Sequence, residues 1–308
     1  MENSKKRILV VGATGMLGEQ IAHNILNEGV SVRLFLRHEY AVDEKKAAKI
    51  EGLTARGAEI TLGALTDMAS LDRATQGVFS VVSALQGGHD VIVTGQVALA
   101  SEASKNGAQR FIPSDYSVDF FKLPAGSHIN LDLRRTADDE IAKKPIEMTN
   151  VLNGGFMEVV FAPFFQIIDI EKSTVAFYGD SRTPIDVTTI ADTAHFTALA
   201  ALEDSPIPGP FGVVGDVVTA DSLCNLLSDI HQKPFSLINK GSIANLKHWI
   251  ETEQVSGRSM VWPTIAAQYM WAMMSGKARV TDPVNVKYPS ISPIKADEFL
   301  KRRVRSTY

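Results

Sequence analysis

Three glycines near the start of the chain have the spacing of a phosphate-binding turn. An apolar run at residues 8–11 leads into Gly12-Ala13-Thr14-Gly15-Met16-Leu17-Gly18, and a helical pattern follows at 19–27. Glycines in such a turn permit a tight bend, a close approach of phosphate to the backbone and close packing of helix on strand. Free N–H groups and the positive end of the helix dipole then face the phosphates. The segment predicts dinucleotide binding; the alternative is a glycine-rich turn without a ligand.

A basic residue, Arg37, follows the next apolar run, residues 30–36. Dinucleotide-binding α/β proteins that prefer NAD usually carry Asp or Glu at this position, and its carboxylate binds the ribose 2′-hydroxyl. A guanidinium instead suits a 2′-phosphate, through paired charge-assisted hydrogen bonds. Lys45 and Lys46 add positive charge nearby, and Glu39 opposes it. We therefore expect NADP(H) to be preferred over NAD(H); the alternative is that Arg37 is a solvated charge at a strand end.

Segments rich in polar residues or glycine also lie at the ends of three later predicted strands, at 83–88, 112–116 and 152–156. The candidate residues within them are Ser83, Ala84, Leu85, Gln86, Ser114, Tyr116, Asn153 and Phe156. Because ligands of open α/β sheets bind outside the carboxyl ends of the strands, these residues are candidates to line a site. Ordinary loop chemistry is the alternative for any one of them.

The elements that must position these residues alternate between strand and helix. Strands are predicted at 8–11, 30–36, 59–62, 78–83, 110–113 and 147–152, and helices at 19–27, 44–52, 68–74, 90–105 and 130–143. This alternation predicts an α/β fold with a doubly wound parallel sheet of the Rossmann type. We expect residues 1–156 to form the NADP-binding domain, with a contribution from about 181–202. Residues 157–308 are expected to form a smaller α+β substrate-binding region.

Composition narrows the class of protein. A chain of 308 residues with 45% hydrophobic residues suits one large domain or two closely joined ones. A net charge of −4 predicts no broad attraction to nucleic acid or anionic membrane, and the basic run at 301–305 is expected to be a solvated tail. The single cysteine, Cys224, is expected to be a packed core thiol in a reducing compartment.

The sequence shows no pattern typical of a targeting segment or of a metal site. It shows no signal-peptide core and no apolar stretch long enough for a membrane span, so a cytoplasmic location is expected. The seven histidines show no close metal-ligand spacing, and no metal is expected. The expected partner is a small-molecule substrate, with a homodimer left open.

Four blocks of the sequence resemble one known family. The residues are the glycine turn 12–18, Arg37, Pro113-Ser114-Asp115-Tyr116 and Leu133-Arg134-Arg135. Together they are similar to the NmrA-like branch of the atypical short-chain dehydrogenases, which contains the isoflavone-reductase-like enzymes. The resemblance covers about residues 6–200. It implies NADPH bound across the sheet and hydride delivery to a small, often aromatic, substrate.

The resemblance also implies roles for particular residues. It places 14–17 on the phosphates, Arg37 on the 2′-phosphate, 83–86 with Gln96 along the ribose and nicotinamide, and Asn153 and Phe156 beside the nicotinamide ring. The expected cofactor-binding residues are Gly12, Thr14, Gly15, Met16, Leu17, Gly18, Arg37, Ser83, Ala84, Leu85, Gln86, Gln96, Ser114, Asn153 and Phe156.

One position departs from the family pattern. The reductases carry a lysine three residues before the Leu-Arg-Arg-like block, and Asn130 stands there in this chain. Asparagine cannot act as a general acid near neutral pH, although its amide can hydrogen-bond a ribose or polarise a carbonyl. Tyr116, Lys122 and His128 are the nearby candidates for handling a proton; the alternative for His128 is a loop histidine without a role. We take Asn130, His128 and Tyr116 as the candidate catalytic residues.

Two functions are consistent with these residues. The first is an NADPH-dependent reductase of a small aromatic or apolar carbonyl or enone-type substrate, which we favour. The second, suggested by Asn130, is a weak or inactive NADP(H)-sensing protein that acts through a protein partner. The acidic cluster Asp138-Asp139-Glu140 is expected to be a solvated helix face. The run of Met and aromatic residues at 262–274 is expected to pack as a helix; the alternative is that it lines a substrate pocket.

Overall fold

The computed structural model describes residues 6–207 and 209–305; residues 1–5, 208 and 306–308 lie outside the described part. The chain forms two compact units. The sheet unit comprises the described residues up to Asp115 together with Leu133–Val151 and Thr193–Phe211. The α+β unit comprises Tyr116–Asp132, Leu152–Asp192 and the described residues from Gly212 onward. The functional roles expected for 1–156 and 157–308 stay predictions.

The sheet unit is built on six parallel strands. They are β1 (Arg7–Val11), β2 (Ser31–Leu36), β3 (Glu59–Leu62), β4 (Ser80–Ser83), β5 (Arg110–Ile112) and β6 (Glu147–Met148). Their order is β3-β2-β1-β4-β5-β6, and each neighbouring pair is parallel. This is the strand order of the Rossmann fold, so the predicted doubly wound sheet is confirmed.

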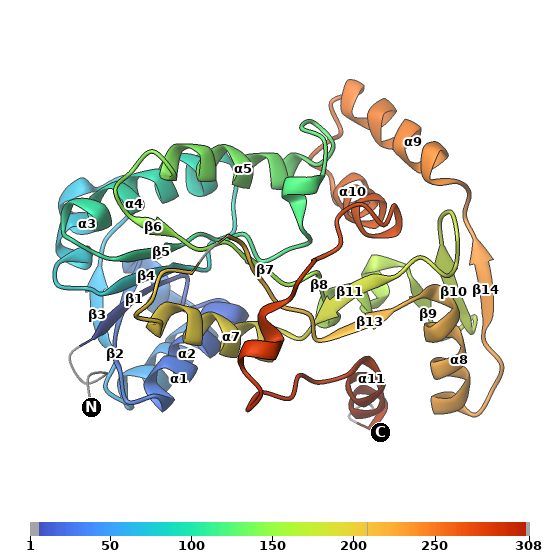
Figure 1. Cartoon of the computed structure of the whole chain (residues 1–308), viewed down its shortest axis with the longest axis horizontal. Helices are drawn as coiled ribbons and strands as arrows, with labels where there is room; N and C mark the ends of the chain where they lie inside the picture. The colour runs from blue at the N-terminus through green and yellow to red at the C-terminus, as the bar shows by residue number, and fades with distance from the viewer. Residues whose placement is uncertain (1–5, 208, 306–308) are drawn as a thin grey trace. The chain divides into compact units, whose positions relative to one another are not determined.

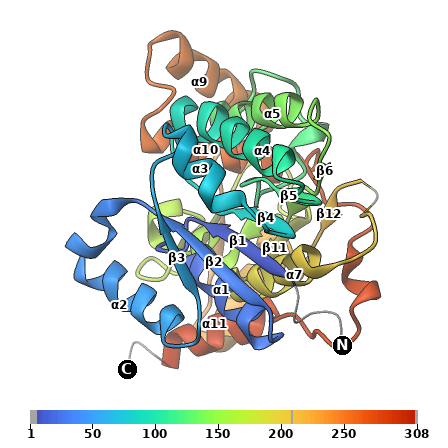
Figure 2. The same cartoon turned by 90° about the vertical axis from the view of Figure 1, so that its left-hand side faces the viewer.

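Helices cover both faces of this sheet. They are α1 (Met16–Asn27), α2 (Glu44–Thr54), α3 (Met68–Thr75), α4 (Gln96–Lys105), α5 (Ile129–Ile141) and α7 (Ile190–Leu202). Figures 1 and 2 show α3, α4 and α5 on one face and α1, α2 and α7 on the other. On the first face Leu9, Val11 and Phe111 pack against Leu99 of α4 and Ile141 of α5. Because alternate strand residues point to opposite faces, the apolar strands bury both faces.

Two predicted elements differ from the structure. The strand expected at 147–152 is divided: β6 ends at Met148, and β7 (Val151–Leu152) pairs with β12 (Phe211–Gly212). At this point the backbone changes its pairing partner: the Phe211 N–H donates to the Asn150 carbonyl at 2.8 Å. The helix expected at 90–105 opens with a wide π-helical segment, Asp90–Gly95, and becomes α-helical only at Gln96.

The α+β unit contains two small sheets. Their strands are β8 (Gly155–Phe156), β9 (Ile168–Asp169), β10 (Thr174–Phe177), β11 (Ile185–Thr188), β13 (Asp216–Val218) and β14 (Ser236–Asn239), in the orders β14-β10-β9 and β13-β11-β8. The helices are α6 (Met157–Val160), α8 (Ala220–His231), α9 (Ile243–Val255), α10 (Trp262–Met274) and α11 (Ala296–Arg305). The helix predicted at 262–274 is confirmed as α10, whose Trp271 lies in the core of this unit.

Two smaller predictions concern the core and the C-terminal region. Cys224 is buried in the same core as Trp271, which confirms a packed thiol; burial raises its pKa. In the basic run at 301–305, Lys301, Arg302 and Arg303 are exposed, as expected, but the run is helical and forms part of α11 and is not a tail. Lys301 pairs with Asp297 and Arg302 with Glu298, one helical turn apart. Among the described residues, no helix has the length and apolar character to cross a membrane.

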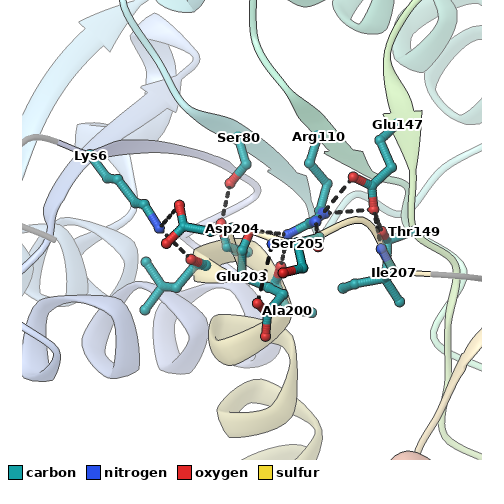
Figure 3. A network of polar contacts seen from close by, with 12 residues as sticks. Lys6, Ser80, Arg110, Glu147, Thr149, Ala200, Glu203, Asp204, Ser205 and Ile207 are labelled. Atoms are coloured by element: carbon teal, nitrogen blue, oxygen red, sulfur yellow. Dashed lines mark hydrogen bonds and ion pairs between the residues drawn. The ribbon is translucent and has the colours of Figure 1, made fainter. Parts of the chain in front are cut away.

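A polar network joins α7 to the amino ends of the strands within the sheet unit (Figure 3). Lys6, just before β1, donates to the Leu202 carbonyl at 2.6 Å, and Ser80 of β4 donates to the Ala201 carbonyl at 2.8 Å. The buried guanidinium of Arg110, on β5, donates to three further carbonyls at this helix end. These contacts satisfy carbonyls that the end of a helix would otherwise leave unpaired.

Candidate functional site

The glycine turn between β1 and α1 leaves no room for side chains at two of its positions. Gly12 has φ +94°, and a Cβ atom there would lie 2.3 Å from the carbonyl oxygen of Ala84, the residue after β4. A Cβ on Gly18 would lie 2.4 Å from the Gly12 carbonyl oxygen. The turn is closed by a hydrogen bond from the Gly15 N–H to the Gly12 carbonyl at 3.0 Å. Backbone therefore packs directly on backbone, as a phosphate-binding turn requires.

The start of α1 is open for an anion. Gly15 is the N-cap residue, and no described side chain makes a capping hydrogen bond there. Met16 in the first turn is 62% exposed. The one acid in the first turn, Glu19, forms an ion pair with Lys49 of α2 at 2.6 Å. The uncapped N–H groups and the helix dipole make this end suitable for a diphosphate.

Arg37 lies at the rim of an open hollow in the sheet unit. The hollow has a volume of about 610 Å³ and is lined by Arg37, His38, Glu39, Val42, Asp43, Lys46, Gly63 and Ala64. Lys46 forms an ion pair with Asp43 at 3.0 Å, which offsets that carboxylate. This volume lies in the range of ligand pockets in proteins. An exposed guanidinium at the end of β2, beside a hollow of this size, is suited to the phosphate of a nucleotide.

The residues after β4 and β5 meet at Ser114. The Ser114 N–H donates to Gln96 Oε1 at 2.9 Å, and its hydroxyl donates to the Leu85 carbonyl at 2.6 Å. Its own carbonyl accepts from Arg134 Nε at 2.9 Å. Gln96 is fully buried and also donates to the Ile92 carbonyl, so within this structure its amide supports Ser114. Direct contacts of Gln96 or Ser114 with a cofactor stay predictions.

Ser83 offers an unused polar group beside the glycine turn. It is the last residue of β4, its side chain is buried, and within the described residues its hydroxyl has no hydrogen-bond partner. The next residue, Ala84, donates its N–H to the Val11 carbonyl at 2.8 Å. Most buried polar side-chain atoms in protein structures have a hydrogen-bond partner, from the protein or an ordered water. Ser83 therefore fits a ligand or an ordered water at this edge.

Two buried carboxyl groups lie behind Ser114, and the sequence did not reveal them. Asp115 and Asp138 are 1% and 3% exposed. The expectation that Asp138 lies on a solvated helix face is therefore wrong; of its two acidic neighbours, Asp139 is exposed and Glu140 partly so. Burial, above all, raises the pKa of Asp115 to about 6 and that of Asp138 to about 10. The run of three acids suggested an exposed helix face. Asp138, however, lies on the buried face of α5, one turn before the apolar Ile141.

The α+β unit brings two predicted site residues to neighbouring segments. The N–H groups of Asn153 and Gly154 donate to the Ser117 carbonyl at 2.9 and 3.2 Å, which places Asn153 beside the residue after Tyr116. Asn153 is fully buried, and neither end of its amide has a partner among the described residues. Phe156 is partly exposed at the end of β8. These placements leave the predicted roles of Tyr116, Asn153 and Phe156 untested.

The N-terminal turn of α5 carries Asn130. Gln268 of α10 accepts the Ile129 N–H at 2.9 Å, and the ring of His128 packs edge-on against Tyr269 with 4.1 Å between centroids. His128 is 1% exposed, whereas Asn130 is partly exposed. The predicted helix at 130–143 is present as α5, but it begins one residue earlier, at Ile129, so Asn130 is its second residue.

Lys122, in the same unit, is held by contacts with neighbouring segments. Its ammonium group donates to the Arg279 carbonyl at 2.6 Å and to the Thr281 hydroxyl at 3.0 Å, and it pairs with Asp119 at 2.9 Å. An ammonium group has three donors, and these contacts engage them. Lys122 is therefore a poor candidate for the missing proton handler.

The strand order and the glycine turn define a Rossmann-type α/β protein with a turn of the dinucleotide-binding form. The chain belongs to the NmrA-like family, whose model matches residues 4–256. This agrees with the resemblance given by the four sequence blocks.

The chain is also similar to individual proteins in sequence and in fold. Pinoresinol reductase 1 of Arabidopsis thaliana is 29% identical over 206 residues, which is 63% of this chain and 64% of that protein. The chain thus aligns with slightly less than two thirds of that relative. A solved structure of AtPrR2 with NADP+ and (+)pinoresinol shares the fold, with a TM-score of 0.82, 23% identity and coverage of 97% of this chain and 98% of that one. A crystal structure of isoflavone reductase gives a TM-score of 0.83 at 17% identity, covering 97% and 99% of the two chains.

Proposed function

We propose that this chain binds NADP(H) and is an NADPH-dependent reductase of a small aromatic or apolar carbonyl or enone-type substrate. The observation that carries the proposal is the glycine turn, in which Gly12 and Gly18 pack backbone on backbone and leave the start of α1 uncapped. The names of the relatives support it: one is a pinoresinol reductase, and one solved structure with the same fold contains NADP+.

The residues of the sheet unit have distinct roles in this proposal. The N–H groups at the start of α1 hold the diphosphate, and Arg37 holds the 2′-phosphate in the hollow. Ser83 supplies the unused buried hydroxyl at the end of β4, and Ser114 forms a rigid rim at the end of β5. The bound cofactor would supply the hydride, and the protein supplies orientation and a proton path.

The proposal is tested by cofactor binding and by turnover. We expect calorimetry of the full chain to show binding of NADPH, and the absorbance of reduced nicotinamide to fall when aromatic aldehydes, enones or quinones are added. Absence of binding of both NADPH and NADH to the folded protein would contradict the whole proposal. Binding without turnover of any compound would retain the cofactor and reject the reductase.

The choice of cofactor is tested by Arg37→Asp. Removing two charge-assisted hydrogen bonds and adding a negative charge should weaken NADPH binding about 100-fold, a loss of roughly 3 kcal/mol, with little effect on NADH. The control is Arg73→Asp, the same charge change at an exposed residue of α3 outside the hollow. Calorimetry with both cofactors measures the effect. An equal loss for NADPH and NADH, or an equal effect of the control, would exclude Arg37 as a 2′-phosphate ligand.

The alternative function is an NADP(H)-sensing protein that acts through a protein partner, and Asn130 in place of the family lysine is the observation that favours it. Asn130→Lys restores a group that can donate a proton, so we expect it to raise the rate of NADPH oxidation or to change cofactor affinity. Asn245→Lys, at an exposed position in the first turn of α9, is the control. If Asn130→Lys behaves like the control in both measurements, Asn130 does not occupy the catalytic-lysine position.

A further inference from the structure

Two acidic side chains are enclosed at the end of β5 with few donors around them. Asp115 Oδ2 accepts from Asn150 Nδ2 at 2.8 Å. Within the described residues, Asp115 Oδ1 and both carboxyl oxygens of Asp138 have no hydrogen-bond partner. A buried ionised carboxylate without donors is costly, and the cost is greater here because the charge of Asp115 also opposes ionisation of Asp138. The arrangement is stable only if at least one of the two carries a proton.

The charges around the pair indicate which group carries the proton. Arg134, one helical turn before Asp138 on α5, is the cation that favours ionisation of both carboxyls. Asp139, on the same helix, opposes ionisation of Asp138. Asn150 donates to Asp115, whereas no described donor reaches Asp138. Asp115 is therefore the anion that balances Arg134, and Asp138 is the acid.

We propose that Asp115 and Asp138 form a buried acid pair that holds a single proton, on Asp138, and that this proton keeps the end of β5 in position. The pair joins three elements of the sheet unit: Asp115 follows β5, Asn150 follows β6, and Asp138 and Arg134 lie on α5. Arg134 also holds the Ser114 carbonyl at 2.9 Å. Loss of the proton would leave two anions against one guanidinium, and the repulsion would act on the segment that carries Ser114.

Infrared spectroscopy of the full chain, with isotope-labelled aspartate, tests the proton directly. At slightly alkaline pH we expect the carbonyl band of a protonated carboxyl group in the wild type. Asp138→Asn should remove this band, and Asp139→Asn, the exposed neighbour on the same helix, should keep it. A wild type without the band, or a band that survives Asp138→Asn, would overturn the proposal.

Stability against pH tests the consequence for the fold. Both pKa values are raised above the ordinary 3.8, so the unfolded chain releases these protons at lower pH than the folded chain. The contribution of the pair to stability is therefore full below about pH 4 and is lost as pH rises through about 6 and then about 10. Urea unfolding should show a smaller alkaline loss for Asp138→Asn than for the wild type and Asp139→Asn. Equal losses in all three would contradict the proposal.

The expected effect of the acid pair on Ser114 rests on the proposed function, because it assumes that Ser114 lies at the cofactor site. Binding of NADP+ tests this effect. If the pair positions Ser114, the affinity of the wild type for NADP+ should fall severalfold between neutral pH and about pH 10, and Asp138→Asn should not show this fall. The same fall in both proteins would overturn the positioning role. Absence of NADP+ binding at every pH would contradict the proposed function alone, because the infrared band decides the acid pair independently.

Discussion

Replacing Gly12 by alanine is expected to abolish cofactor binding and to lower the free energy of unfolding by about 3 kcal/mol or more. The added Cβ would lie 2.3 Å from the Ala84 carbonyl oxygen and 2.8 Å from its carbonyl carbon. These are backbone atoms, and Ala84 is itself held by a hydrogen bond to Val11. The clash can be relieved only by moving β4 away from the turn, which would displace Ser83 and the start of α1. Calorimetry and urea unfolding measure the two effects.

A matched control separates this clash from backbone strain. Gly57 has φ +96°, almost the value of +94° at Gly12, but nothing lies within 4 Å of a Cβ built there. Gly57→Ala should therefore show only the conformational penalty, about 1–2 kcal/mol, and should leave cofactor binding unchanged. If Gly12→Ala cost no more than Gly57→Ala and still bound cofactor, the close packing of the turn would have no role in binding.

The sequence alone predicted the features that are determined by residues adjacent in the chain. The glycine turn, its preceding strand and its following helix are specified by neighbouring residues, and all three are present, although α1 begins at Met16, three residues before the predicted start. The position of Arg37 after β2 is local in the same sense. A parallel sheet followed from the alternation of strands and helices, because parallel strands need long crossover connections. The four blocks shared with the NmrA-like family gave its identity for the same reason.

The sequence was not sufficient where a residue depends on a distant partner. Asp138 looks solvated in a run of three acids, and only its burial beside Asp115, twenty-three positions earlier, reveals the acid pair. The hydrogen bonds of the Gln96 amide with Ser114 and Ile92 were likewise invisible in the sequence, and its predicted contact with a cofactor stays a prediction. The split of the last predicted strand required knowledge of Phe211, which pairs with Asn150. No periodicity in one segment can encode such contacts.

Arg110 is the clearest example of a residue whose role depends on distant partners. In the sequence it is only a charged residue at the start of an apolar strand. Its Nε and Nη2 donate to the two carboxylate oxygens of Glu147, each at 3.1 Å (Figure 3). Nη1 donates to the Ala200 and Glu203 carbonyls at 2.6 and 2.7 Å, and Nη2 to Ser205 at 2.8 Å. All five donors of the guanidinium are engaged, and the residue is 2% exposed.

Arg110→Met is expected to lower the free energy of unfolding by about 3–5 kcal/mol, because it leaves Glu147 and three carbonyls of the α7 end without their donor. Arg110→Lys should lower the free energy of unfolding by a smaller amount, since an ammonium group keeps the charge but has only three donors and lacks the planar guanidinium geometry. Arg182→Met is the control: it removes an exposed pair with Asp180 at 3.2 Å and should leave the free energy of unfolding close to that of the wild type.

Urea unfolding of the three variants at neutral pH measures the ranking. The geometry requires Arg110→Met to be the least stable, Arg110→Lys to be intermediate and Arg182→Met to be close to the wild type. A further consequence follows for α7, whose last carbonyls are held by Lys6, Ser80 and Arg110. Hydrogen exchange at the end of this helix should accelerate in Arg110→Met more than exchange in α1. If Arg110→Met matched the surface control in stability and exchange, the network would not be what fixes α7 to the sheet.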